Sequence, residues 1–138
     1  MINWELLYNK YGQKKSAEKF EDMALEYVQN VYSNYTWKAT GRTRDGNRDF
    51  HNLETDLLNI WGEAKYKKAS ISLTRKDLDP TILSGLIDGT VQLIIFVTNG
   101  KIPDSLAARM VLGANMKGIK LSFVTGIQLS DWLILNPE

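Results

Sequence analysis

Residues 49–65, DFHNLETDLLNIWGEAK, contain the pattern that decides the fold, because two acids and a lysine stand at the edges of an apolar segment. The residues before Glu63 are apolar nearly throughout, which is typical of a strand covered on both faces. Side chains alternate between the faces of a strand, so Glu63 and Lys65 point to one side and Ala64 points to the other. If Asp49 comes from the neighbouring strand, two carboxylates and one ammonium group meet.

Such a cluster predicts a metal site. Two adjacent carboxylates repel each other unless a cation joins them, and oxygen-rich sites of this kind suit Mg²⁺. Together with the lysine, they are the working parts of a metal-dependent phosphodiesterase. The residues alone leave two alternatives open: Glu63 and Lys65 can form a salt bridge at a solvated strand end, and Asp49 can close the preceding Gly/Arg loop as a turn residue, a part that Asp45 can also play.

The composition indicates one soluble globular domain. The chain has 138 residues, of which 43% are hydrophobic and 24% are charged. The absence of cysteine excludes disulfides and Cys-ligated zinc, and the single histidine, His51, excludes His-rich metal sites. No secretion signal or membrane-length apolar run is present in the sequence, so we expect a cytoplasmic protein with no membrane contact.

The basic charge is concentrated around the predicted site. Residues 38–76 carry nine Lys or Arg against five acids, whereas the first 37 residues carry four against five and the last 62 carry four against six. A phosphate backbone would have to lie there. A charged loop also serves solubility alone, but the candidate phosphate contacts are Arg42, Arg44 and Arg48 before Asp49, and Lys67 and Lys68 after the apolar strand.

The rest of the chain predicts alternating helices and strands. Residues 1–15 form an arm or short helix, and a first helix starts with Ser16 as its N-cap and ends near residue 34. Strands are expected at residues 35–40, around 49–50 and at 57–66, with a turn at 41–46 and a hairpin at 52–56. The remaining elements are a helix from Asp79-Pro80 to Gly89, a strand at 91–98, a helix from Pro103 to Gly118, a strand at 119–125 and a helix at 127–135. This order predicts a three-layer α/β fold with a mixed central sheet flanked by helices.

Four segments together carry a family resemblance. They are Phe20-Glu21 in the first helix, GRTRDGNRD at residues 41–49, Glu63-Ala64-Lys65 on a strand, and IIFVTN at residues 94–99. Over residues 16–135 the chain resembles the Mrr-like branch of the PD-(D/E)xK nucleases, which have the restriction-endonuclease-like fold. The two acids are 14 positions apart (63 minus 49). Two departures from the family pattern are Arg48, where Pro is usual, and Glu63, where many close relatives have Gln.

The resemblance implies a role for each matching residue. Asp49 and Glu63 would bind Mg²⁺, for which Mn²⁺ substitutes, with the backbone carbonyl of Ala64 as a further ligand. Lys65 would orient the attacking water or help to deprotonate it, and would stabilise the developing charge. Glu21 would support the site directly or through water, although its position fits an ordinary helix-surface acid equally well.

The resemblance also implies a function. Relatives with this combination are DNA endonucleases of restriction and antiviral defence, which leave 5′-phosphate and 3′-hydroxyl ends. They are often N-terminal effector domains fused to an NTPase or sensor module, so residues 16–138 would be such a domain of a longer protein. Cutting both strands usually requires two active sites, which implies a homodimer or higher oligomer. The rival interpretations are a catalytically inactive nuclease fold that only binds nucleic acid, and an interaction module that assembles a larger complex.

Overall fold

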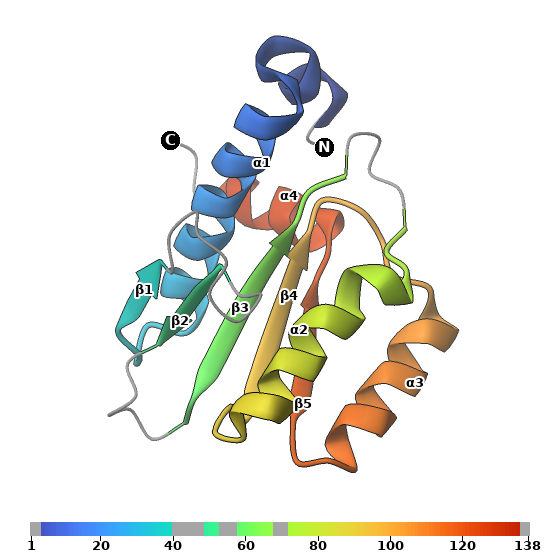
Figure 1. Ribbon diagram of the computed structural model, residues 1–138. Helices are drawn as coiled ribbons and strands as arrows, with labels where there is room; N and C mark the ends of the chain where they lie inside the picture. The colour runs from blue at the N-terminus through green and yellow to red at the C-terminus, as the bar shows by residue number, and fades with distance from the viewer. Residues whose placement is uncertain (1–3, 40–48, 53–57, 68–71, 136–138) are drawn as a thin grey trace.

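The computed structural model describes residues 4–39, 49–52, 58–67 and 72–135 (Figure 1). The element order is α1 (Trp4–Val31), β1 (Trp37–Ala39), β2 (Phe50–Asn52), β3 (Ile60–Lys65), α2 (Arg75–Asp88), β4 (Leu93–Thr98), α3 (Asp104–Asn115), β5 (Lys120–Val124) and α4 (Gly126–Leu135). The predicted succession of helices and strands is confirmed. The predicted turn at 41–46 and most of the predicted hairpin at 52–56 lie outside the described residues.

The five strands form one mixed sheet in the order β1-β2-β3-β4-β5. The pairs β1–β2 and β2–β3 are antiparallel, whereas β3–β4 and β4–β5 are parallel. Helices α1 and α4 lie on one face of the sheet, and α2 and α3 lie on the other (Figure 1). The predicted α/β architecture with a mixed sheet between helical layers is therefore confirmed.

Strand β3 is buried on both faces, as its apolar sequence predicts. Ile60 belongs to the core under α1 and α4, together with Phe20 and Leu129. Trp61, the next residue, belongs to the core under α2 and α3, together with Leu78. The alternation continues along the strand, so Glu63 and Lys65 share the α2 face with Trp61.

The start of the first helix differs from the prediction. α1 contains Ser16, which is fully buried, and the helix is interrupted at Gly12 instead (φ 78°, ψ 175°). The predicted N-cap at Ser16 is therefore wrong. The left-handed backbone at position 12 suits glycine, and the Gln and Lys residues that follow favour helix, so the helix resumes before Ser16.

The start of α2 is also wrong in the prediction, which placed it at Asp79-Pro80. The helix begins about one turn earlier because Thr74 and Asp77 form a capping box, in which the Thr74 N–H donates to Asp77 Oδ2 at 2.8 Å. The Asp77 N–H also donates to the Thr74 carbonyl at 3.0 Å and closes the first backbone turn. Pro80 lies inside the helix and forgoes one backbone hydrogen bond. Gly89 ends α2 with φ 79°, as predicted.

Candidate functional site

The pairing of β2 with β3 brings Asp49 to the level of Glu63. Phe50 lies opposite Gly62 in the antiparallel register. The Asp49 N–H donates to the Gly62 carbonyl at 2.8 Å, and the Ala64 N–H donates to Asp49 Oδ2 at 2.7 Å. Asp49 therefore enters the sheet directly before β2, with its carboxylate held by the backbone of β3.

Two local features fix this register. A Cβ at Gly62 would stand 1.8 Å from a ring carbon of Phe50, so only glycine allows the buried ring to lie across β3. Asn52 is also buried: its Nδ2 donates to the Leu58 carbonyl at 2.6 Å and its Oδ1 accepts from the Ile60 N–H at 2.8 Å. These contacts tie the end of β2 to the beginning of β3 and so hold Asp49 beside Glu63.

Glu63 is the centre of the site. Its side chain projects toward α2 and is buried, with a relative exposure of 7% for the residue. Thr81 of α2 donates a hydrogen bond from Oγ1 to Glu63 Oε2 at 3.1 Å, and Lys65 Nζ lies 3.3 Å from the same oxygen. The Glu63 carboxyl group also lies within hydrogen-bonding reach of the Asp49 side chain. The structure thus brings Asp49, Glu63 and Lys65 together, as the sequence predicted.

The surroundings of Glu63 favour its protonated form. Burial raises its pKa, and the hydrogen bond and negative charge of Asp49 raise it further, whereas the Lys65 ammonium and the Thr81 hydroxyl lower it; the resulting pKa is about 9. Near neutral pH Glu63 therefore keeps its proton, and Lys65 faces a neutral Glu63 in spite of its ion-pair distance. If Glu63 loses this proton, Asp49 and Glu63 together can balance one more positive charge than Lys65 supplies.

This pKa predicts an unusual dependence of stability on pH. In EDTA, folded Glu63 keeps a proton that the unfolded chain releases above its ordinary pKa of 4.5. The contribution of the protonated Glu63 to stability is complete below about pH 4.5 and is lost as pH rises through about 9. The free energy of unfolding should therefore fall over this range by up to about 1.4 kcal/mol per pH unit. Urea unfolding of Glu63→Gln should show a flatter pH profile than the wild type. Glu26→Gln, at an exposed position, is the control, and equal profiles for Glu63→Gln and wild type would contradict the assignment.

The donor set fits a divalent cation. Mg²⁺ in phosphoryl-transfer sites is held by one or two carboxylates, with water and substrate phosphates completing its coordination. Asp49 and Glu63 supply two carboxylates close enough to share a hydrogen bond. Within the described residues, no group of three or more His, Asp or Glu gathers around a common point. The Asp49–Glu63 pair is the place where a cation would replace the shared proton.

Glu21 lies on a helix of the opposite face. α1 packs on the sheet face shared by Phe20 and Ile60, whereas Glu63 points toward α2. α1 does approach the end of β3, because the Phe20 ring lies 5.9 Å from the ring of Tyr66, directly after the strand. Glu21 is therefore near the end of β3 that carries Glu63, and its supporting role stays a prediction. The role of the Ala64 carbonyl as a metal ligand also stays a prediction.

Of the predicted phosphate contacts, only Lys67 lies within the described residues; the others, Arg42, Arg44, Arg48 and Lys68, lie outside them. Lys67 Nζ is 2.7 Å from Asp77 Oδ1. Burial works to raise the pKa of Asp77, but the hydrogen bonds from Lys67 and Thr74 and the charge of Lys67 outweigh it and hold that pKa below its usual value. The Lys67 backbone is fixed by Asn99, whose Oδ1 accepts from its N–H at 2.7 Å. Lys67 therefore ties the end of β3 to α2.

The sequence prediction missed Thr81, a fully buried hydroxyl that contacts Glu63. The signal was available in part, since Thr81 lies on the buried stripe of α2 between Leu78 and Gly85, where a polar residue needs a partner. Its partner is 18 residues away in the sequence, so the pattern could not identify it.

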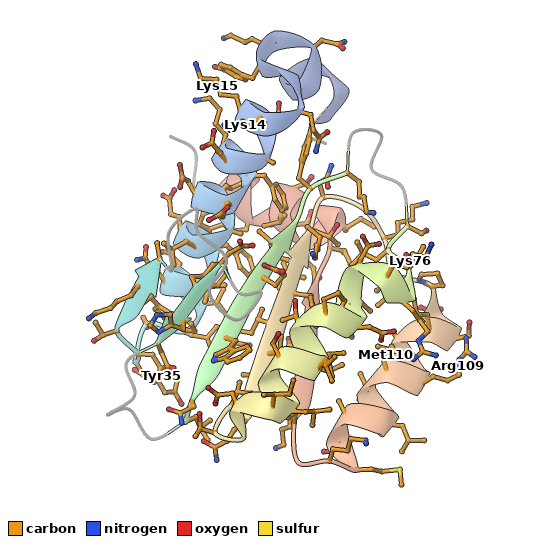
Figure 2. The ribbon with its side chains drawn as sticks, in the orientation of Figure 1. Lys14, Lys15, Tyr35, Lys76, Arg109 and Met110 are labelled. Atoms are coloured by element: carbon orange, nitrogen blue, oxygen red, sulfur yellow. The ribbon has the colours of Figure 1, made fainter. Side chains whose placement is uncertain are left out.

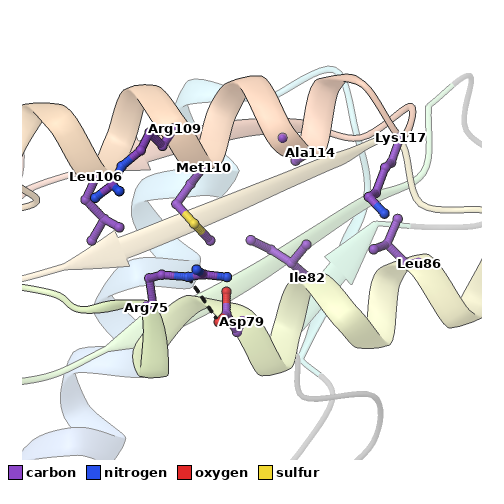
Figure 3. Close-up of a pocket in the computed structure, with 10 residues that line it drawn as sticks. Arg75, Asp79, Ile82, Leu86, Leu106, Arg109, Met110, Ala114 and Lys117 are labelled. Carbon is purple, nitrogen blue, oxygen red and sulfur yellow. Dashed lines mark ion pairs between the residues drawn. The ribbon is translucent and has the colours of Figure 1, made fainter.

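A groove outside the site lies between α2 and α3, with a volume of about 260 Å³. Ile82 from α2 and Met110 from α3 point into it, and Arg75 pairs with Asp79 at 3.4 Å along its edge (Figure 3). Neither Asp49 nor any residue of β3 lines this groove, so its shape does not bear on the chemistry of the site.

Comparisons with known proteins do not assign the chain. No protein-family model and no curated protein matches it. No helix within the described segments is long and apolar enough to cross a bilayer. The functional interpretation therefore depends on the geometry and electrostatics of Asp49, Glu63 and Lys65.

Proposed function

We propose that this chain is a metal-dependent DNA endonuclease domain with the restriction-endonuclease-like fold of the Mrr-like nucleases. The observation that carries the proposal is the contact of Asp49 with the buried Glu63, beside the ammonium group of Lys65. A structural salt bridge needs one carboxylate for one lysine. A second carboxylate that forces its neighbour to hold a proton is unfavourable for folding and is expected where a cation is to be bound.

Asp49 and Glu63 would hold one or two Mg²⁺ or Mn²⁺ ions. The metal supplies a Lewis acid for the phosphoryl oxygen and lowers the pKa of bound water. The Ala64 N–H fixes the orientation of Asp49, and the Thr81 hydroxyl fixes that of Glu63. Because both ligands are held from β3 and α2, the site needs little rearrangement to accept a cation.

Lys65 supplies positive charge on the same face as Glu63. Its ammonium group is half-buried, so its charge is screened less than that of a fully exposed lysine. An ammonium placed where negative charge develops on the phosphoryl group stabilises the transition state more than the ground state. We assign it this role together with orientation of the attacking water.

The proposal is tested by incubating supercoiled plasmid with the purified chain in Mg²⁺, Mn²⁺ or EDTA. Wild type should nick or linearise the plasmid in either metal and not in EDTA, and Asp49→Asn should be inactive. Asp79→Asn is a matched control, since Asp79 is a partly exposed carboxylate paired with Arg75 outside the site. Product ends that a ligase reseals would identify 5′-phosphate and 3′-hydroxyl groups.

The domain would act on DNA in the cytoplasm. It would do so as a homodimer or higher oligomer, because cutting both strands usually requires two sites. A single site predicts nicked circles before linear product, whereas paired sites predict linear product from the start. If equal residual cleavage by wild type, Asp49→Asn and Asp79→Asn were observed, the nuclease would be a contaminant and the proposal would be wrong.

A further inference from the structure

Four exposed lysines gather at the N-terminal part of α1. Lys10, Lys14, Lys15 and Lys19 are all solvent-exposed, and Glu18 is the one acid among residues 6–20, so the segment carries a surplus of three positive charges (4 minus 1). Figure 2 shows Lys14 and Lys15 on this part of the helix. None of the four is among the basic residues that the sequence pattern assigned to DNA, because the chain up to residue 37 has no basic surplus.

The break at Gly12 gathers these charges. Lys10 and Lys19 are nine residues apart, which corresponds to about 13 Å along a straight helix. In the structure both ammonium groups lie over the ring of Tyr11, at 5.2 Å for Lys10 and 4.5 Å for Lys19. Contacts of this kind hold the two lysines in place while their charges stay accessible. The backbone at Gly12 therefore creates a basic cluster whose compactness the sequence spacing does not indicate.

The position of the cluster relates it to the candidate site. The N-terminal part of α1 extends beyond the ends of β3 and β4 toward which both strands run (Figure 1). Lys19 is next to Phe20, whose ring contacts Tyr66 directly after β3. Lys15 lies about one turn, roughly 6 Å, farther along the helix. The cluster thus stands at the same end of the sheet as Glu63 and Lys65.

We infer that this lysine cluster is a docking surface for the phosphate backbone of DNA. The choice of DNA as the polyanion rests on the proposed function, and the surface would hold duplex that flanks the scissile phosphate. Lysines contact phosphates as point charges without reading bases, so the surface contributes affinity that is independent of sequence. Each phosphate contact also makes binding weaker as salt rises, because bound counterions are released.

The inference is tested by fluorescence anisotropy with a labelled duplex oligonucleotide in EDTA, so that binding is measured without cleavage. The test variant is Lys14→Ala/Lys15→Ala, and the control is Lys117→Ala/Lys120→Ala, which removes the same charge between α3 and β5. The test variant should bind about ten-fold more weakly at low salt, with a slope of log K against log salt shallower by about 1.8, as expected for two lost phosphate contacts. The control should retain the wild-type slope.

Equal losses in both double variants, no loss in either, or no DNA binding by wild type would overturn the inference. Binding to phosphatidylserine vesicles that depends on Lys14 and Lys15, with no such dependence for DNA, would also overturn it in favour of a membrane surface. Failure of the proposed function is distinguishable: DNA binding that depends on these lysines without metal-dependent cleavage supports the docking surface and contradicts the nuclease. Metal-dependent cleavage with unchanged DNA binding by the test variant supports the nuclease and contradicts the docking surface.

Discussion

Replacing Lys65 with alanine is expected to lower the rate of metal-dependent DNA cleavage by about 10²–10³-fold, the loss typical of removing one group that stabilises developing charge. The Lys65 ammonium lies 3.3 Å from Glu63 Oε2 and is the cation that the described site supplies from β3. The variant should fold normally and should bind Mn²⁺ at least as tightly as wild type, because removing a positive charge favours a cation. Single-turnover cleavage of a labelled duplex measures the rate.

Lys120→Ala is the matched control, since Lys120 is an exposed lysine at the beginning of β5. It should cleave at the wild-type rate. Lys65→Arg separates charge from shape: retention of some activity would indicate that positive charge is the main contribution of Lys65. A Lys65→Ala variant that cleaves as fast as wild type would exclude Lys65 from the reaction.

Replacing Gly62 with alanine is expected to destabilise the fold by about 3 kcal/mol or more, at the upper end of overpacking effects. The added methyl group would stand 1.8 Å from Phe50 Cε2 and 2.3 Å from two further ring carbons. Phe50 is fully buried, and Trp37 packs against its ring at a centroid distance of 6.1 Å, so the ring has no free space to enter. Urea denaturation at fixed pH measures the change through the transition midpoint.

Gly113→Ala provides the control for Gly62→Ala. Gly113 lies in α3, where nothing stands within 4 Å of an added Cβ, so alanine there should stabilise the protein by up to about 1 kcal/mol. Phe50→Leu should recover part of the stability lost in Gly62→Ala, because the clash is with the ring. If Gly62→Ala is as stable as wild type, Phe50 does not lie across β3, and the register that holds Asp49 beside Glu63 is wrong.

The sequence predicted the centre of the site because strand geometry is regular. A period of two determines that Glu63 and Lys65 share a face, and antiparallel pairing brings Asp49 to that face from the neighbouring strand. The order of helices and strands could be predicted from apolar periodicity, because side chains repeat at regular intervals in helices as well as in strands. What the sequence did not supply was the strand register, which depends on the close approach of Phe50 to Gly62.

Contacts between distant segments could not be predicted. The hydroxyl of Thr81 is aimed at Glu63 by the packing of α2 on the sheet, and the ion pair of Lys67 with Asp77 joins two elements that the sequence separates. The two wrong helix starts have local causes. The Thr74–Asp77 capping box begins α2 before Pro80, and the break in α1 is at Gly12, four residues before the serine that was expected to cap the helix.

The most direct test of the candidate site is a calorimetric titration of Mn²⁺ into the metal-free chain at mildly alkaline pH, with wild type, Asp49→Asn and the control Asp79→Asn. This measurement needs no DNA and no partner. Saturable binding by wild type and Asp79→Asn, weakened at least ten-fold in Asp49→Asn, is the result expected if Asp49 and Glu63 hold a divalent cation. Absence of binding by wild type, or equal binding by wild type and Asp49→Asn, would contradict a metal site at this pair and with it the nuclease assignment.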